Sequence, residues 1–122
     1  MFYPVHSIHS YVHNARIGVM VEFGLETDFA ERSDGFSRIA RDIALHIAAM
    51  APADVGDLLS QPAVMRPQST IGELLVELAD ELREQLAVIR FVRWVADASA
   101  SDGDGPQPPD SPAVVARLPI AG

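Results

Sequence analysis

Apolar and polar residues alternate most regularly between positions 17 and 25. Successive side chains of a β-strand point to opposite faces, so this alternation predicts a strand with one buried face. The apolar face consists of Ile17, Val19, Val21, Phe23 and Leu25. Residues 5–13 alternate more weakly, and Asn14-Ala15 separates the two runs, which together predict a β-hairpin. Ala15 stands where glycine would suit a tight two-residue turn, so we expect a slightly longer loop.

Two later segments have apolar residues at helical spacing, which predicts two helices that each bury one face. Ser33 can cap the first, Asp34 is favourable in its first turn, and Pro52 stops it. Thr70 and Glu73 have the spacing of a capping box and open the second helix. The apolar stripes are formed by Phe36, Ile39, Ala40, Ile43, Ala44, Ile47 and Ala48, and by Ile71, Leu74, Leu75, Leu78, Ala79 and Leu82.

Residues 86–95 (LAVIRFVRWV) are rich in β-branched and aromatic residues and predict a third strand. The order β-β-α-α-β predicts an α+β fold: a three-stranded antiparallel sheet with two main helices on one face. In a regular strand, Ile89, Phe91 and Val95 lie on one side, and Leu86, Val88, Val92 and Trp94 on the other. Apolar residues on both sides of a strand in so small a domain favour burial by a second subunit over a purely intramolecular core.

Composition changes after Val95. Residues 1–95 form the predicted core, whereas residues 96–122 are rich in Ala, Ser, Asp, Gly and Pro and predict a disordered tail. Docking of the apolar residues near the end of this tail is the alternative. A total of 122 residues permits one modest domain, and the net charge of −8 argues against a general nucleic-acid binder.

The same composition limits the chemistry and the location. The chain has no cysteine, which excludes disulfides, thiolate catalysis and cysteine metal sites. No apolar run approaches the ~20 residues that span a bilayer, and no signal peptide is recognised at the N-terminus. We therefore expect a cytoplasmic protein without membrane association, and the sequence indicates no cofactor.

Several motifs occur in the order and spacing of a known family. Tyr11-Val12-His13, Arg16–Val19 (RIGV), Glu26–Phe29 (ETDF) and residues 41–50 (RDIALHIAAM) are similar to the dimerisation core of bacterial elongation factor Ts. Further along, residues 61–64 (QPAV) resemble the family's QPFV, and residues 90–94 (RFVRW) resemble its closing strand. The matched stretches span most of residues 3 to 95. The resemblance implies the predicted fold and, as a partner, elongation factor Tu or a related GTPase.

The ETDF motif is where the resemblance changes the interpretation most. Without it, Phe29 would be a core residue or a hydrophobic staple, next to a short turn that Thr27 can cap. The resemblance implies instead that Phe29 is exposed and enters a pocket in the nucleotide domain of elongation factor Tu, which promotes GDP release. The residues that match the motif are Thr27, Asp28 and Phe29. The predicted partner-binding set adds two looser matches, Ala30 and Arg32.

The sequence also departs from the family pattern. The family's N-terminal ubiquitin-associated-like module has no counterpart in this chain. Residues 53–60 replace a long insertion, and Arg83 replaces a helix-ending glycine, so we expect that turn to be built differently. An exchange factor must hold its empty partner more tightly than the nucleotide-bound one. Lost contacts therefore favour a second hypothesis, a diverted adaptor or stabilising subunit that binds a partner without exchange.

Other chemistry-bearing residues have simpler interpretations. His9 and His13 can share a strand face, but no carboxylate or thiol follows at a metal-binding spacing, so we predict no metal site. His46 is predicted to be a packed or interface histidine. Acidic residues near the ETDF motif lie on one short turn rather than across a pocket, so we predict no hydrolytic enzyme and no covalent catalysis. The predicted homodimer interface consists of Val88, Val92, Trp94 and His46.

Overall fold

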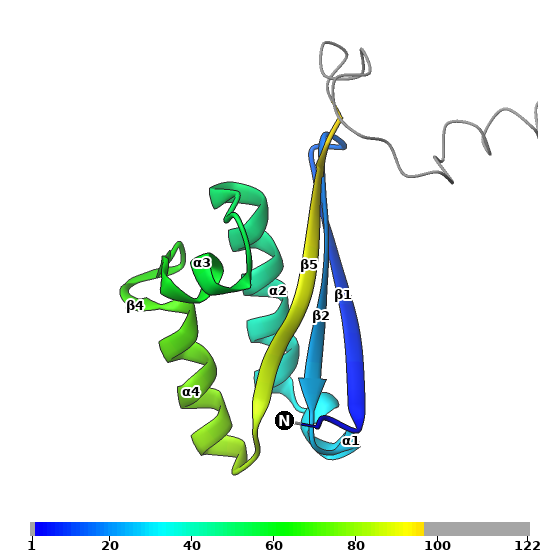
Figure 1. The fold of residues 1–122 in the computed structure, drawn as a ribbon, viewed down its shortest axis with the longest axis vertical. Helices are drawn as coiled ribbons and strands as arrows, with labels where there is room; N and C mark the ends of the chain where they lie inside the picture. The colour runs from blue at the N-terminus through cyan, green and yellow to red at the C-terminus, as the bar shows by residue number, and fades with distance from the viewer. Residues whose placement is uncertain (1, 97–122) are drawn as a thin grey trace, which may run out of the picture.

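The computed structural model describes residues 2–96. An antiparallel sheet in the order β1-β2-β5 is formed by β1 (Val5–His13), β2 (Ile17–Leu25) and β5 (Leu86–Val95). The main helices, α2 (Asp34–Met50) and α4 (Ile71–Leu82), lie on the same side of this sheet, and the opposite side is open (Figure 1). The predicted α+β fold is therefore confirmed. The predicted tail, from residue 97 onward, lies outside the described residues.

Four short elements were not predicted from the sequence. They are α1 (Asp28–Glu31), α3 (Val55–Ser60), β3 (Pro62–Ala63) and β4 (Arg66–Thr70). The Asp54 carboxylate caps α3 by accepting from the Asp57 N–H at 2.8 Å. Together α3 and the β3–β4 pair form a compact link between the two main helices. Such elements are too short to show a helical or strand period, which explains why the pattern missed them.

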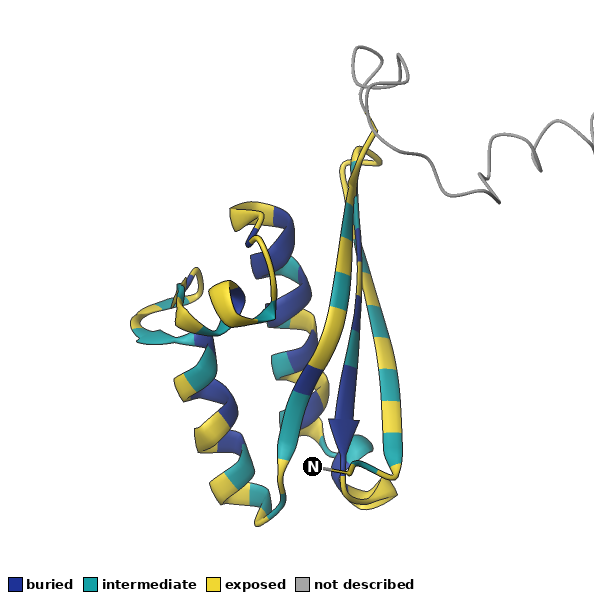
Figure 2. Cartoon of the chain, viewed as in Figure 1, coloured by how far each residue is buried: buried dark blue, intermediate teal, exposed yellow. Residues whose placement is uncertain are grey.

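The core lies between the inner face of β2 and the apolar stripes of the two main helices. Figure 2 shows buried residues mainly along the second half of β2 and on the inward sides of α2 and α4, with further buried positions in α3 and β5. Phe23 on β2 meets Phe36 on α2 edge to face, with ring centroids 5.2 Å apart. The strand phase predicted for residues 17–25 is confirmed. The buried apolar residues include Val19, Val21, Phe23, Leu25, Phe36, Ile43, Ile47, Ile71, Leu75 and Leu78.

The predicted helix starts are also confirmed. The Ser33 hydroxyl accepts from the Phe36 N–H at 3.1 Å and caps α2. At α4, Glu73 N–H donates to the Thr70 hydroxyl at 3.1 Å, and Thr70 N–H donates to the Glu73 carboxylate at 2.8 Å. This reciprocal pair satisfies two backbone donors that the helix itself cannot pair.

Non-glycine residues adopt the left-handed region at three places: in the hairpin loop, at Ala51 after α2, and at Arg83 after α4. The hairpin loop has three residues, Asn14 to Arg16, as expected from Ala15, and Asn14 and Ala15 have φ of 51° and 58°. Arg83 ends α4 with φ of 58°, and the N–H groups of Arg83 and Glu84 both donate to the Ala79 carbonyl. The expectation of a differently built turn at Arg83 is therefore wrong. Arginine adopts the conformation that glycine normally supplies, at a cost in backbone strain.

A β-bulge changes the predicted phase of β5. Glu22 pairs with Arg90 whereas Phe23 pairs with Val88, so Ile89 is the extra residue. Val88 therefore faces the helices and is buried, while Val92 and Trp94 lie on the outer face. The prediction that these three residues share one side is wrong, because the bulge was not visible in the sequence. Arg93 is turned inward and donates to the Ala48 carbonyl at 3.0 and 3.2 Å, at the end of α2.

His46 is the packed histidine of the core. It is fully buried on α2, its Nδ1 accepts from the Val64 N–H at 3.2 Å, and its Nε2 lies 2.7 Å from Gln61 Oε1. Because Nδ1 accepts, Nε2 carries the proton and donates to Gln61. His46 thereby ties the end of α2 to the link before α4.

Candidate functional site

The ETDF motif forms a tight turn between β2 and α2, at the end of the sheet opposite the hairpin loop (Figure 1). Thr27 has an extended backbone and caps α1, its hydroxyl accepting from the Ala30 N–H at 3.1 Å. At the other end of α1, the Ser33 hydroxyl donates to the Ala30 carbonyl at 2.7 Å. Asp28 lies in the first turn of α1, where a negative charge is favoured by the unpaired N–H groups. The short helix is therefore held at both ends.

Phe29 projects from this turn. Its side chain is 73% exposed, whereas the next residue, Ala30, is fully buried beneath the turn. Thr27, Asp28 and Arg32 are also exposed, so the turn presents polar groups around one aromatic ring. Ala30 is too deeply buried to contact a partner, and it packs in the core beneath the turn. Such large exposure of an isolated phenylalanine argues against the core role that the motif would have without its family resemblance.

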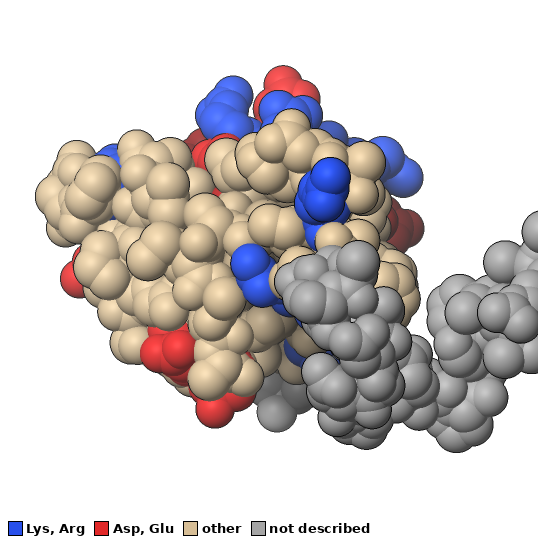
Figure 3. Space-filling model, turned by 90° about the horizontal axis from the view of Figure 1, so that it is seen from above, with Lys and Arg blue, Asp and Glu red and all other residues tan. Residues whose placement is uncertain are grey.

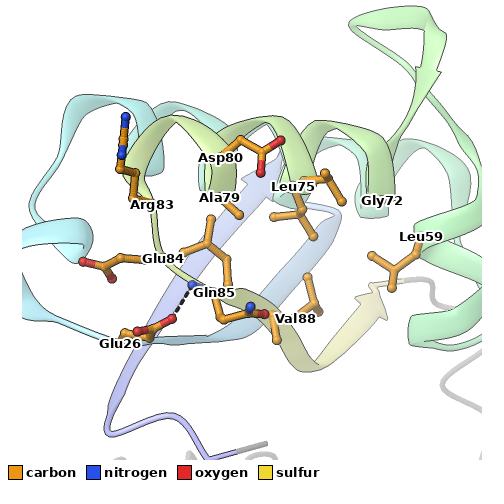
Figure 4. A pocket seen from close by; sticks show the side chains of 13 residues that line it. Glu26, Leu59, Gly72, Leu75, Ala79, Asp80, Arg83, Glu84, Gln85 and Val88 are labelled. Atoms are coloured by element: carbon orange, nitrogen blue, oxygen red, sulfur yellow. Dashed lines mark hydrogen bonds between the residues drawn. The ribbon is translucent and has the colours of Figure 1, made fainter.

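Two hydrogen bonds that the sequence analysis did not predict join the turn to residues just before β5. Glu26 accepts from the Gln85 N–H at 2.5 Å, just before β5 begins (Figure 4). The Thr27 hydroxyl donates to the Glu84 carboxylate at 2.5 Å. We call these two contacts, Glu26 to Gln85 and Thr27 to Glu84, the brace. The partners lie 59 and 57 residues apart, and no local pattern in the sequence signals such a pairing.

A groove runs beside the brace, between α4 and the first half of β5. It has a volume of about 710 Å³, and Figure 4 shows Leu75 of α4 and Val88 of β5 facing it from its two sides. The floor is apolar, with Leu59, Leu75 and Val88, and the rim near the turn carries Glu26 and Glu84. The groove and the Phe29 turn thus share one border.

The outer face of the sheet combines exposed apolar side chains with one charged cluster. Val92 and Trp94 of the predicted dimer interface lie here, together with Ile8, Val12 and Met20 from the other two strands. Glu22 is at the centre, 2.6 Å from His6 Nδ1 and 2.7 Å from Arg90 Nε. Hydrogen bonds from His6 and then Arg90 lower the pKa of Glu22 below its usual value. Val88 and His46, also predicted for the interface, are instead buried inside the chain.

The strand histidines lie as the alternation predicts, with His6 on the outer face and His9 on the inner face. His9 stands edge-on to the rings of Phe23 and Phe36, with centroids 5.7 and 5.3 Å away. Burial lowers the pKa of His9 below its ordinary value, opposed in part by Glu31. In residues 2–96, no group of three histidine, cysteine or acidic side chains is arranged to hold a metal ion.

Figure 3 shows the face of the molecule at the hairpin end. On this face, arginine side chains of the described residues gather over the middle and the upper part of the view, while acidic side chains lie mostly toward its edges. Within the same part of the chain, no helix is long and apolar enough to cross a bilayer.

Comparison with known proteins agrees with the motifs. Residues 3–57 match the sequence model of the family described as "Elongation factor TS". A protein named elongation factor Ts from Rubrobacter xylanophilus is 34% identical, over 71% of this chain and 68% of its own length. Proteins of the same name from Coprothermobacter proteolyticus and Desulfotalea psychrophila are 32% and 29% identical, over 68% and 70% of their lengths. With the sheet, both main helices and the ETDF turn in place, this chain belongs to the elongation factor Ts family.

Proposed function

We propose that this protein binds elongation factor Tu or a related GTPase and promotes GDP release by inserting Phe29 into it. The observation that carries the proposal is the 73% exposure of Phe29 on a turn whose backbone is held at both ends. A phenylalanine that enters a pocket buries on the order of 150 Å² or more of its surface, which makes it an effective wedge. A turn that is already ordered loses little entropy when it binds.

The partner surface proposed from the structure is smaller than the set read from the motif. Phe29 is the inserted group, and Asp28 and Arg32 flank it as exposed charges that can fix its orientation. Thr27 and Ala30 act on the chain's own side, one as the helix cap and the other as a buried anchor. Exchange then follows if the inserted ring stabilises the nucleotide-free partner more than the GDP-bound one.

We also propose that a second copy of the chain covers the outer face of the sheet. Its exposed apolar residues come from all three strands, and Trp94 alone is 57% exposed. Contiguous apolar surface of this kind on a small domain is typical of an interaction site. The Phe29 turn lies at one end of the sheet rather than on this face, so pairing leaves the wedge free (Figure 1).

A second candidate function is an adaptor that binds the same partner without exchange. The compact link formed by α3, β3 and β4 favours it, because this link replaces the family's long insertion and its contact area. In that case the chain would bind GDP-bound and empty partner equally, and bound nucleotide would leave at its basal rate.

The test is release of a fluorescent GDP analogue from elongation factor Tu, measured by stopped flow with wild type, Phe29→Ala and Phe2→Ala. Phe2 is a matched control, since it is also an exposed phenylalanine. We expect stimulation by wild type and Phe2→Ala, loss of stimulation by Phe29→Ala, and unchanged melting for all three. Binding without stimulation by wild type would support the adaptor instead. A large fall in the melting temperature of Phe29→Ala would show that Phe29 is structural and refute the wedge.

A further inference from the structure

The brace connects the Phe29 turn to a part of the chain that lies far away in sequence. Glu26 and Thr27 lie between β2 and α1, whereas Glu84 and Gln85 form the turn between α4 and β5. Each turn contributes one carboxylate: Glu26 accepts from the backbone before β5, and Glu84 accepts from the side chain of Thr27. Hydrogen bonds to ionised acceptors are stronger than those between neutral groups. The two turns are therefore fixed relative to each other at two points.

The single hydroxyl group of Thr27 makes two hydrogen bonds, one as an acceptor and one as a donor. A hydroxyl has a single proton to donate and lone pairs with which to accept. As the cap of α1, it must accept from the Ala30 N–H, so its proton must point elsewhere. Glu84 receives that proton, which leaves a lone pair directed at Ala30. Glu84 thus orients the cap on which the position of Phe29 depends.

The contact at Glu84 is not an efficient source of stability. One of its two carboxylate oxygens, Oε1, is buried and has no hydrogen-bond partner among the described residues. A buried acceptor without a partner destabilises the folded state and offsets much of what the bond to Thr27 contributes. A buried polar atom without a partner is uncommon in folded proteins and calls for an explanation. The geometry is better explained by positioning of the turn than by stabilisation of the fold.

We propose that Glu84, supported by Glu26, is a positioning residue for the Phe29 wedge. The inference rests on the function proposed above. Without the bond from Thr27, the cap of α1 loosens and the free protein holds Phe29 in its binding geometry for only part of the time. The apparent affinity for a partner falls in proportion to that fraction, whereas the bound complex is unchanged. Replacing Glu84 should therefore raise the concentration of this protein that gives half-maximal GDP release, and should leave the maximal rate of release unchanged.

The first experiment needs no partner. Amide hydrogen exchange, followed by NMR on the full chain, compares wild type with Glu84→Ala, Glu84→Gln and the control Glu81→Ala. Glu81 is an exposed carboxylate on the same end of α4, without a hydrogen bond among the described residues. We expect the Ala30 amide to lose protection in Glu84→Ala, to regain it in Glu84→Gln and to stay as in wild type in Glu81→Ala. Equal protection of Ala30 in Glu84→Ala and wild type would overturn the proposal.

The second experiment titrates the same variants against elongation factor Tu loaded with fluorescent GDP. Glu84→Ala should raise the half-saturating concentration roughly three- to tenfold, the effect of losing one hydrogen bond of ordinary net strength, and leave the maximal rate unchanged. Phe29→Ala should instead lower the maximal rate. An unchanged half-saturating concentration for Glu84→Ala would contradict positioning. If wild type itself fails to stimulate release, the proposed function is wrong, while the Ala30 amide still decides whether the brace holds the turn.

Discussion

The turn after α4 allows a stability prediction that can be worked from one dihedral angle. Arg83 has φ of 58°, in the left-handed region, where the Cβ of a non-glycine residue crowds its own carbonyl at a cost of about 1–2 kcal/mol. Glycine avoids this crowding, although its greater freedom in the unfolded chain reduces the gain in stability by about 0.4–1 kcal/mol. We therefore expect Arg83→Gly to raise the free energy of unfolding by about 1 kcal/mol. For a domain of this size, the melting temperature should rise by about 4–8 °C.

Arg83→Gly both removes the arginine side chain and relieves the backbone strain, so the two effects on stability have to be measured separately. Arg83→Ala removes the side chain but keeps the Cβ, so it should leave stability near that of wild type. Asn tolerates the left-handed region better than most residues, so Arg83→Asn should lie between Ala and Gly. Thermal and urea unfolding, monitored by circular dichroism, give the order of the three variants. If Gly were no more stable than Ala, the strain assigned to this turn would be refuted.

Three other predictions follow from the core, the outer face and the buried histidine. Ile43→Ala and Leu78→Ala should each destabilise the fold by about 2–5 kcal/mol in urea unfolding, because both side chains are buried between helix and sheet; an unchanged midpoint would contradict the packing described. Sedimentation should give roughly twice the 13.2 kDa chain mass for wild type and the single mass for Trp94→Asp, and a monomeric wild type would rule out pairing through this face. Because burial depresses the pKa of His9, its contribution to stability is present above its ordinary value of 6.5 and lost as the pH falls below it. Unfolding of His9→Gln should depend less on pH in that range, and identical pH profiles would refute the assignment.

Periodic sequence patterns predicted the parts of the fold that repeat. The strand phase of residues 17–25, the two helix stripes and the caps at Ser33 and Thr70 were all predicted correctly, because each depends on residues close together in the chain. The β5 bulge was not predictable, since one extra residue leaves no mark in a strand rich in apolar residues. At Arg83 the tertiary fold imposes a backbone conformation against the preference of the residue.

The candidate site also has some features that were predicted from the sequence and others that were not. Thr27 and Phe29 were identified from the family resemblance, and the exposure of Phe29 agrees with the role that it implies. The brace was missed because Glu84 and Thr27 are joined by the fold alone, across 57 residues of sequence. Val88 and His46 were placed in the interface from the sequence, but a strand bulge and a buried hydrogen-bond pair keep them inside. A single sequence gives little information on contacts between segments that lie far apart along the chain.

The position of β2 between β1 and β5 also bears on when the Phe29 turn becomes ordered during folding. The β1–β2 hairpin closes through a three-residue loop, whereas both main helices lie between β2 and β5 in the sequence. Closing a long loop has the greater entropic cost, so we expect the hairpin to form early and β5 to join late. Both contacts of the brace depend on the turn that leads into β5. A nascent chain therefore lacks both contacts of the brace until β5 has emerged from the ribosome, and until then we expect its Phe29 turn to be ordered for only part of the time.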